Sequence, residues 1–230
     1  MKISVRRKLN NEGAAMMVSI IIIAVLMIFA FSLVLISYTL YASQNKNLAS
    51  MRNMEACNTL SVALEKDIVS DNAHSDSNLW KYLRCNVFSD AWPYYNPGEA
   101  GHDMEDAARQ FYLEGYSEME GLPAKTTVKM YWTLPEGADM SDYETMTDDL
   151  EKLEFKKGIR LYIEIQCDTG NQSYKVTDVY KLFTDDILLE ENAAALQTEL
   201  GNIKGNSAFN PDSNAILTNE LWTWRHESRK

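Results

Sequence analysis

The sequence contains few residues at the spacings that catalysis requires. Its three histidines, His74, His102 and His226, lie far apart in polar stretches, and none belongs to an HExxH pattern of metal ligands. No GxSxG sequence is present to hold a nucleophilic serine, and the stretch Gly201–Gly205 lacks the Lys-Ser/Thr pair of a phosphate-binding loop. The sequence therefore predicts a protein that is not an enzyme and that needs no cofactor.

Acidic residues are concentrated in residues 135–157, where carboxylates outnumber lysines. Clustered carboxylates are the ligands that Ca²⁺ prefers, so a calcium site is one interpretation of this segment. The spacing of an EF-hand loop is absent, and the composition favours a solvated loop with a short helix near Met146–Leu153. We expect the loop with its helix, and we assign no metal ligand.

Three cysteines, Cys57, Cys85 and Cys167, lie at wide spacing and form no CxxC pair. No cluster of cysteine and histidine has the spacing of zinc ligands. One disulfide with one free thiol is compatible with an exported domain, and so are three small buried apolar side chains. The sequence leaves the pairing of these thiols open.

The element that dominates the chain is a long uncharged segment near its start. No residue from Gly13 to Asn45 is charged, and Met16–Ile36 is apolar except for Ser19 and Ser32. About 20 apolar residues suffice to cross a bilayer as a helix. The sequence thus predicts a transmembrane helix over residues 14–42.

Charge on either side of this segment indicates its orientation. The leader, residues 1–13, holds four basic residues and one acidic residue, whereas the whole chain has a formal net charge of −11. Lysine and arginine beside a span resist translocation, so we expect the leader in the cytoplasm and the acidic remainder outside the cell membrane. An acidic domain also argues against nucleic acid as a partner, because nucleic-acid binding needs a basic surface.

A cleaved secretory signal fits this segment poorly. Such signals have an apolar core of about 7–15 residues and end in a site with small residues at fixed positions. Here the apolar run is longer, and the best candidate site, Leu40-Tyr41-Ala42, has a bulky residue where a small one is expected. We therefore expect the apolar segment to be retained.

The border between leader and apolar run resembles the type IV prepilin and pseudopilin family. The stretch "EGAAMMVSIIIIAVLMIFAFSLVL" has the family's glycine directly before a long apolar helix. The resemblance implies that a prepilin peptidase cuts between Gly13 and Ala14, and that the apolar helix anchors the subunit before it packs in a filament. The implied partners are the peptidase, the assembly platform, other subunits and membrane lipid.

One position departs from the pattern of major pilins. Their fifth mature residue is glutamate, whereas the fifth residue after the expected cut is Val18. Members without this glutamate include minor pilins and the minor pseudopilins of type II secretion, so the resemblance points to a minor subunit. The alternative is an uncleaved, single-pass anchored surface protein whose domain outside the membrane binds a ligand or partner.

The remaining chain predicts an α+β fold of the kind found in pilins. An amphipathic stem helix is expected over 43–70, continuous with the membrane helix, and an extracytoplasmic α+β domain over 71–230. Period-two alternation predicts strands at residues 126–134, 158–168 and 173–183, with the last two forming a hairpin. The stem helix is the natural cover for the apolar face of this antiparallel sheet of three or more strands.

Other segments give less regular patterns. We expect helices at 103–119, with Asp103 as a cap, and at 185–200, ended by Gly201, and a short strand around Leu221–Trp224. Alternation slips near Thr177-Asp178, which indicates a bulge. We expect a polar turn at residues 70–78. Residues 89–102 should form an ordered loop, and its aromatic residues either fold onto the domain or form a sugar-binding platform.

Overall fold

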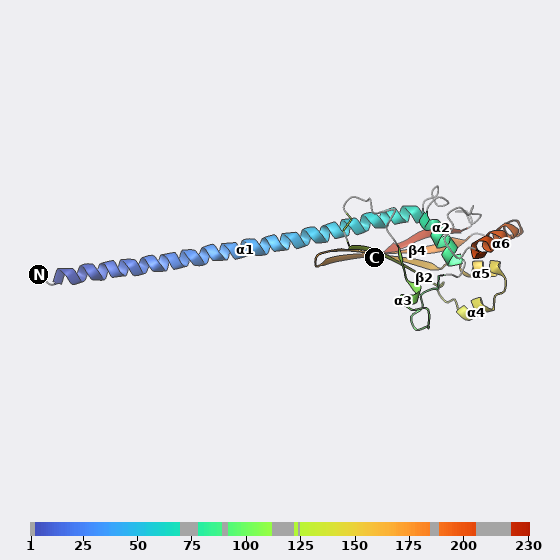
Figure 1. The fold of residues 1–230 in the computed structure, drawn as a ribbon, viewed down its shortest axis with the longest axis horizontal. Helices are drawn as coiled ribbons and strands as arrows, with labels where there is room; N and C mark the ends of the chain where they lie inside the picture. The colour runs from blue at the N-terminus through green and yellow to red at the C-terminus, as the bar shows by residue number, and fades with distance from the viewer. Residues whose placement is uncertain are drawn as a thin grey trace. The chain divides into compact units, whose positions relative to one another are not determined.

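The computed structural model describes residues 3–69, 78–88, 92–111, 122–123, 125–184, 189–205 and 222–230. The chain forms two compact units, Met1–Ala49 and Ser50–Lys230, and helix α1 (Ile3–Val69) contributes residues to both (Figure 1). We call Ser50–Lys230 the globular unit, and the part of α1 within it, Ser50–Val69, the stem segment. A long N-terminal helix and an antiparallel sheet are both present, so the predicted α+β fold is confirmed.

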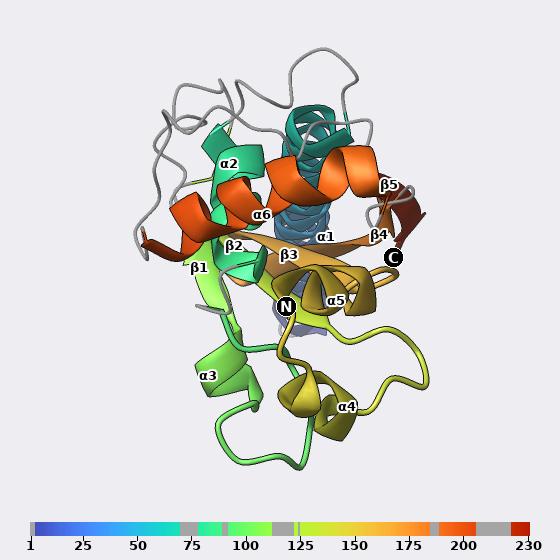
Figure 2. The same ribbon diagram turned by 90° about the vertical axis from the view of Figure 1, so that its right-hand side faces the viewer.

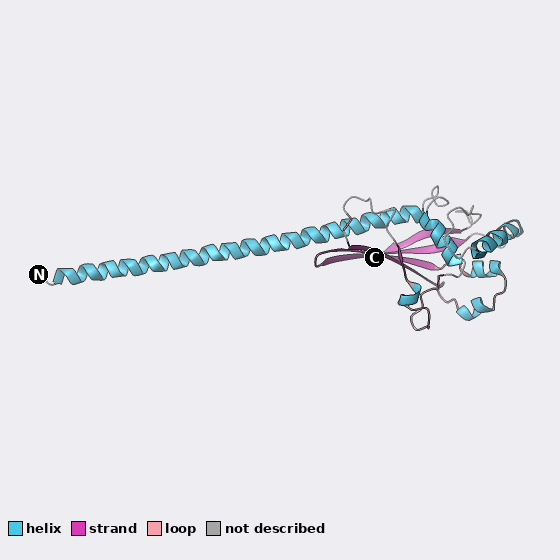
Figure 3. Cartoon of the chain, viewed as in Figure 1, coloured by secondary structure: helices cyan, strands magenta, loops and turns pink. Residues whose placement is uncertain are grey.

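The described part of the globular unit is built on one antiparallel sheet of five strands. Its strands are β1 (Arg109–Phe111), β2 (Lys125–Thr133), β3 (Arg160–Thr169), β4 (Gln172–Thr184) and β5 (Trp222–Arg229). Each pairs with the next along the chain, which makes the sheet a meander (Figure 3). The three strands predicted from alternation are β2, β3 and β4, and Gly170 closes the β3–β4 hairpin with a positive φ of 60°.

Five shorter helices surround this sheet in the described residues. They are α2 (Asn78–Phe88), α3 (Met104–Ala107), α4 (Met140–Thr145), α5 (Asp149–Phe155) and α6 (Glu190–Gly205). Three of them begin at an aspartate whose side chain accepts a hydrogen bond from a backbone N–H: Asp103 before α3, Asp139 before α4 and Asp148 before α5. These caps satisfy amide groups that the first helical turn leaves without partners.

The stem segment covers one face of the sheet. Its buried apolar residues lie on one side of the helix, because Cys57, Leu60, Leu64 and Ile68 recur every three or four positions and Ala56 adjoins Cys57. They share one apolar core with the buried alternate residues of β2 and β3. Figure 2 shows this part of α1 nearly end-on, above the sheet. The predicted cover of the sheet by an amphipathic helix is thus confirmed.

A line of polar side chains runs through this apolar contact. Asn53, Cys57, Ser61 and Glu65 lie at four-residue spacing on the stem segment, and each meets a partner on the sheet. The contacts are Asn53 Nδ2 to Gln172 O (2.8 Å), Cys57 Sγ to Tyr174 O (3.4 Å), Ser61 Oγ to Asp178 Oδ2, and Arg229 Nη2 to Glu65 Oε2 (2.6 Å). Apolar packing alone tolerates sliding, whereas these directional contacts fix the register of the helix along β4.

The helix expected over residues 103–119 is confirmed only at its start and is wrong at residues 109–111. Asp103 caps a helix as expected, but that helix, α3, ends at Ala107. The chain then forms β1, which pairs with β2 in the register Arg109↔Met130 and Phe111↔Val128. Pairing with a distant strand outweighs the local helical preference here, and residues 112–119 lie outside the described residues.

Two C-terminal elements differ in extent from those expected. Helix α6 begins at Glu190 and runs to Gly205, so Gly201 does not end it. A glycine that ends a helix adopts a positive φ, and Gly201 does not. Strand β5 continues to Arg229 rather than stopping at Trp224, because it pairs with β4 along its whole length.

A bulge lies close to the position expected near Thr177-Asp178, on the β5 side of β4, where the register shifts between Val179 and Tyr180. Pairing of β3 with β4 is continuous through these residues, and Asp178 occupies a regular inward-facing position. Alternation breaks at Asp178 in the sequence because a charged residue fills a core position, where its neighbours compensate its charge.

Candidate functional site

The expected processing position lies inside helix α1. The helix begins at Ile3 instead of at Ala14, so the bond between Gly13 and Ala14 is helical. A side chain at Gly13 would meet nothing within 4 Å. Glycine destabilises a helix interior by about 1 kcal/mol relative to alanine. No packing contact within the described residues therefore accounts for glycine at this position.

The helical surface that follows Gly13 is apolar on every side. All side chains from Gly13 to Tyr41 are exposed, including Ala14 and Val18. From Gly13 onward α1 is long and apolar enough to cross a membrane, although a signal sequence passes the same test of length and composition. A helix that is apolar all round needs lipid or other protein around it, because water would leave this surface unfavourably hydrated.

Three of the hydroxyls in this segment donate to carbonyl groups of the helix itself. Ser19 Oγ donates to the carbonyl of Ala15 (3.0 Å), and Ser32 Oγ donates to that of Ile28 (2.8 Å). Thr39 Oγ1 similarly donates to the carbonyl of Ile36 (2.8 Å). A polar group without a partner is costly in hydrocarbon, so these internal bonds make the segment compatible with lipid or a filament core.

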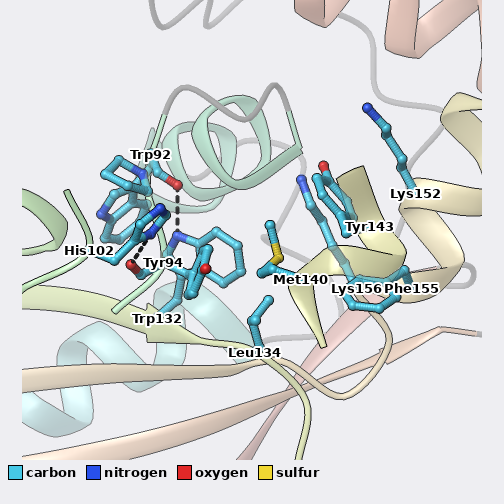
Figure 4. Close-up of a pocket in the computed structure, with 11 residues that line it drawn as sticks. Trp92, Tyr94, His102, Trp132, Leu134, Met140, Tyr143, Lys152, Phe155 and Lys156 are labelled. Atoms are coloured by element: carbon cyan, nitrogen blue, oxygen red, sulfur yellow. Dashed lines mark hydrogen bonds between the residues drawn. The ribbon is translucent and has the colours of Figure 1, made fainter. Parts of the chain in front are cut away.

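A cavity of about 420 Å³ lies in the globular unit, between the loop 92–102 and helices α4 and α5 (Figure 4). Its aromatic walls pack on one another: the rings of Tyr94 and His102 lie 3.9 Å apart, and those of Tyr94 and Trp132 lie 5.9 Å apart. The ring nitrogens of Trp132 and His102 are paired with backbone carbonyls. Trp132 Nε1 donates to Trp92 O (3.0 Å), and His102 Nδ1 lies 2.9 Å from Tyr94 O.

This arrangement decides between the two interpretations of the aromatic loop. Trp92 and Tyr94 are buried, so they form core rather than an exposed platform for a sugar ring. Trp92 Nε1 donates to Ala107 O (2.6 Å), which ties the loop to α3. The expectation that the aromatic residues fold onto the domain is thus confirmed.

A lysine that the sequence analysis did not single out lies at the cavity. Lys156 is buried, and its Nζ donates to Val87 O (2.6 Å). The ammonium also lies 5.3 Å from the ring centroid of Tyr143 and 5.9 Å from that of Trp132. Figure 4 shows Lys156 beside Tyr143 at the wall opposite Trp92 and His102. These contacts anchor the end of α5 to α2 and to the sheet.

A buried carboxylate on β4, that of Asp178, is bonded to side chains from the stem segment and from β5. Asp178 Oδ2 accepts from Ser61 Oγ, and Oδ1 accepts from Arg229 Nε at 2.6 Å and lies 3.3 Å from His226 Nε2. The residue types are those of a hydrolase triad, but here serine bonds to aspartate rather than to histidine. Ser61 is also fully buried, so this arrangement is a structural clasp and not a site for substrate.

The structure brings some of the singled-out residues together and not others. Cys57 and Cys167 are free, buried thiols that contact each other between the stem segment and β3. Cys85 belongs to α2, and its side chain lies outside the described residues. His74 also lies outside them.

In residues 135–157, Asp139 and Asp148 cap helices, and no group of three or more metal-binding side chains occurs among the described residues. The short helix expected near Met146–Leu153 is α5, shifted slightly toward the C-terminus.

Comparison with known proteins identifies no relative. No protein-family model matches the chain, and neither a curated protein nor a solved structure matches it.

Proposed function

We propose that the chain is a minor pilin or pseudopilin-like subunit of a type IV pilus or type II secretion filament. The observation that carries this proposal is the single helix α1, which joins a segment that is apolar on every side to a stem segment packed on an antiparallel sheet. A subunit that passes from lipid into a filament core needs such a helix, because apolar packing replaces lipid contact without a charge to bury. Its role is structural and not enzymatic.

Processing is proposed to occur after Gly13, which leaves Ala14 as the first mature residue. Glycine at this position has no packing role in the described structure, which supports a role in recognition by a prepilin peptidase. The further partners are the inner-membrane assembly platform, other subunits and, before assembly, membrane lipid. The acidic globular unit faces outward, on the extracytoplasmic side of the cell membrane.

Val18 supports a minor rather than a major subunit. Its side chain is apolar and exposed on the helix, and it offers no carboxylate to pair with a neighbour's N-terminal amine. A subunit without this carboxylate cannot pair with the N-terminal amine of its neighbour, which suits a component present in few copies.

The decisive experiment is the mass of the mature N-terminus. The full chain is expressed in cells with an active prepilin peptidase, and the proposal expects a protein that begins at Ala14. Gly13→Leu should abolish the cut, whereas Ser37→Leu, which also adds leucine to the apolar segment, should leave it intact. A wild-type chain that still begins at Met1 in these cells would refute the proposal.

One observation favours a second candidate, an uncleaved single-pass anchor whose globular unit binds a ligand or partner. Helix α1 runs through Gly13 without interruption, so the leader is part of the same helix. This candidate predicts an intact leader in wild type and no effect of Gly13→Leu on the mass of the chain.

A further inference from the structure

Two of the three cysteines meet where the stem segment crosses the β3–β4 hairpin. Cys57, on the stem segment, and Cys167, on β3, both have 0% of their surface exposed. Cys57 Sγ lies 3.7 Å from Ile165 O and 3.4 Å from Tyr174 O. Ile165 precedes Cys167 by two positions on the same face of β3, and Tyr174 is the residue of β4 directly opposite Cys167. The Cys57 sulfur is therefore directed at the part of the hairpin that holds Cys167.

The two thiols also contact each other. Hydrogen bonding to Cys167, together with burial, raises the pKa of the Cys57 thiol. The same hydrogen bond, which Cys167 accepts from Cys57, lowers the pKa of the Cys167 thiol. Thr126 Oγ1 lies 3.8 Å from Cys167 Sγ and donates a hydrogen bond to it, which also lowers the pKa of the Cys167 thiol.

We propose that Cys57 and Cys167 form a disulfide that locks the stem segment to the sheet. The proposal rests on the proposed function in one respect, since it needs the globular unit to reach an oxidising compartment. It involves two segments that are more than 100 residues apart in the chain, and it leaves Cys85 outside the bond.

The bond forms by exchange with a disulfide-bearing oxidant, such as a protein thiol oxidase or oxidised glutathione. The thiolate of one cysteine attacks one sulfur of the oxidant and releases its other sulfur as a thiolate. The thiolate of the second cysteine then attacks the protein sulfur in the mixed disulfide and releases the second oxidant thiolate. The protein pair loses two protons and two electrons, and the oxidant disulfide becomes two thiols.

Burial determines when this exchange happens. Both sulfurs are enclosed once the stem segment is seated, so an oxidant reaches them only before the globular unit closes or while it is open. Once formed, the bond is shielded from reductant in the same way. It closes a loop of about 110 residues, and loops of this length gain the most from a cross-link. We expect its reduction to lower the melting temperature by on the order of 10 °C.

The test counts thiols in the full chain exported by living cells. Cells are lysed in denaturant with a maleimide and without reductant, and the intact mass gives the number of labelled cysteines. We expect one label on the wild type, none on Cys85→Ser, and a Cys57–Cys167 cross-linked peptide after proteolysis. Three labels on a chain whose globular unit is accessible to external protease would overturn the proposal.

A second arm separates failure of the disulfide from failure of the proposed function. If external protease does not reach the globular unit, the full chain is purified in detergent, reduced, unfolded and refolded in a glutathione redox buffer. The proposal expects the Cys57–Cys167 bond in this case as well, and a different pair or three free thiols would overturn it.

Stability measurements add a readout that does not depend on labelling. Reductant present during unfolding should lower the melting temperature of the wild type and of Cys85→Ser. It should have no effect on Cys57→Ala or Cys167→Ala, and these two variants should lose similar amounts of stability. A wild-type melting temperature that is insensitive to reductant during unfolding would contradict the proposal.

Discussion

The hydroxyl of Ser61, on the stem segment, donates a hydrogen bond to the buried carboxylate of Asp178, on β4, across 117 residues of sequence. Both residues are fully buried, and the other carboxylate oxygen accepts from Arg229. Arg229 in turn donates to Glu65 (2.6 Å), one helical turn beyond Ser61. A single aspartate thus ties the helix to the sheet and to its last strand. An unpaired charge at this depth would be strongly destabilising, so these partners account for its presence in the core.

Asp178→Ala should lower the free energy of unfolding by about 3 kcal/mol, the lower end of the range for breaking a buried ion pair. The loss should not be larger, because Arg229 reaches solvent and keeps Glu65 as a partner. Denaturant unfolding monitored by tryptophan fluorescence measures the change. Asp142→Ala, at an exposed position in α4, is the control and should change stability by less than about 0.5 kcal/mol. Equal effects of the two variants would show that Asp178 is not the centre of the clasp.

Ser61→Ala should lower the free energy of unfolding by about 1–3 kcal/mol, because it leaves a buried carboxylate oxygen without its donor. The same substitution should have a much smaller effect when Asp178 is already alanine, since the acceptor has gone. A double-mutant cycle measures this difference as a coupling energy of at least about 0.5 kcal/mol. Strictly additive losses would mean that the two residues act independently.

Lys156→Met should lower the free energy of unfolding by about 1–3 kcal/mol, because it leaves the buried carbonyl of Val87 without the Nζ donor. Methionine retains much of the side-chain volume, so the effect isolates the ammonium from the packing. Lys157→Met, at the adjacent exposed position, is the matched control and should be nearly neutral. If the two variants are equally stable, the ammonium of Lys156 does not hold α5 in place.

Tyr180→Phe should make the protein less sensitive to alkali. Burial, followed by repulsion from Asp178 and Glu65, raises the pKa of the Tyr180 phenol above its ordinary value of 10.0. A group whose pKa is raised in the folded state contributes stability that is complete below the unfolded pKa and is lost as pH rises above it. Removing the phenol should therefore reduce the fall in unfolding free energy above pH 10 by up to about 1.4 kcal/mol per pH unit.

At neutral pH the same variant should be as stable as the wild type or slightly more stable. The Tyr180 hydroxyl is buried and has no hydrogen-bond partner among the described residues, so phenylalanine removes an unsatisfied group. Tyr174→Phe, on the same strand, serves as the control. Parallel stability curves for wild type and Tyr180→Phe above pH 10 would contradict the prediction.

The sequence predicts the regular part of the fold because its pattern is local. Ile163 and Ile165 alternate with Glu164, and Leu60 and Leu64 lie one helical turn apart, so the faces of β3 and the stem segment can be assigned before any contact is known. Strand β1 and helix α2 could not be predicted in this way. Arg109–Phe111 becomes a strand only because Val128 to Met130 lies beside it, a pairing that leaves no local pattern.

The clasp and the thiol pair were missed for the same reason. In the sequence, Asp178 interrupts the alternating pattern of a strand. Its partners, Ser61 and Arg229, come from distant segments and meet it only in the folded chain. Cys57 and Cys167 likewise become neighbours only when the stem segment is seated. Gly13 and Val18 are the reverse case, because the sequence pattern singled them out and the fold gives neither of them a contact that explains it.

The stem segment and the strands on which it packs lie far apart in the sequence. This separation affects how the chain folds during synthesis. Cys57 and the carbonyl of Ile165 that it reaches are 108 residues apart. At about 5–20 residues per second, the ribosome needs roughly 5–20 s to add the strand that covers the helix. During this interval Leu60, Leu64 and Ile68 have been synthesised but have no sheet to pack on. Biogenesis of this protein therefore has to protect an apolar helix for seconds before its own fold can do so.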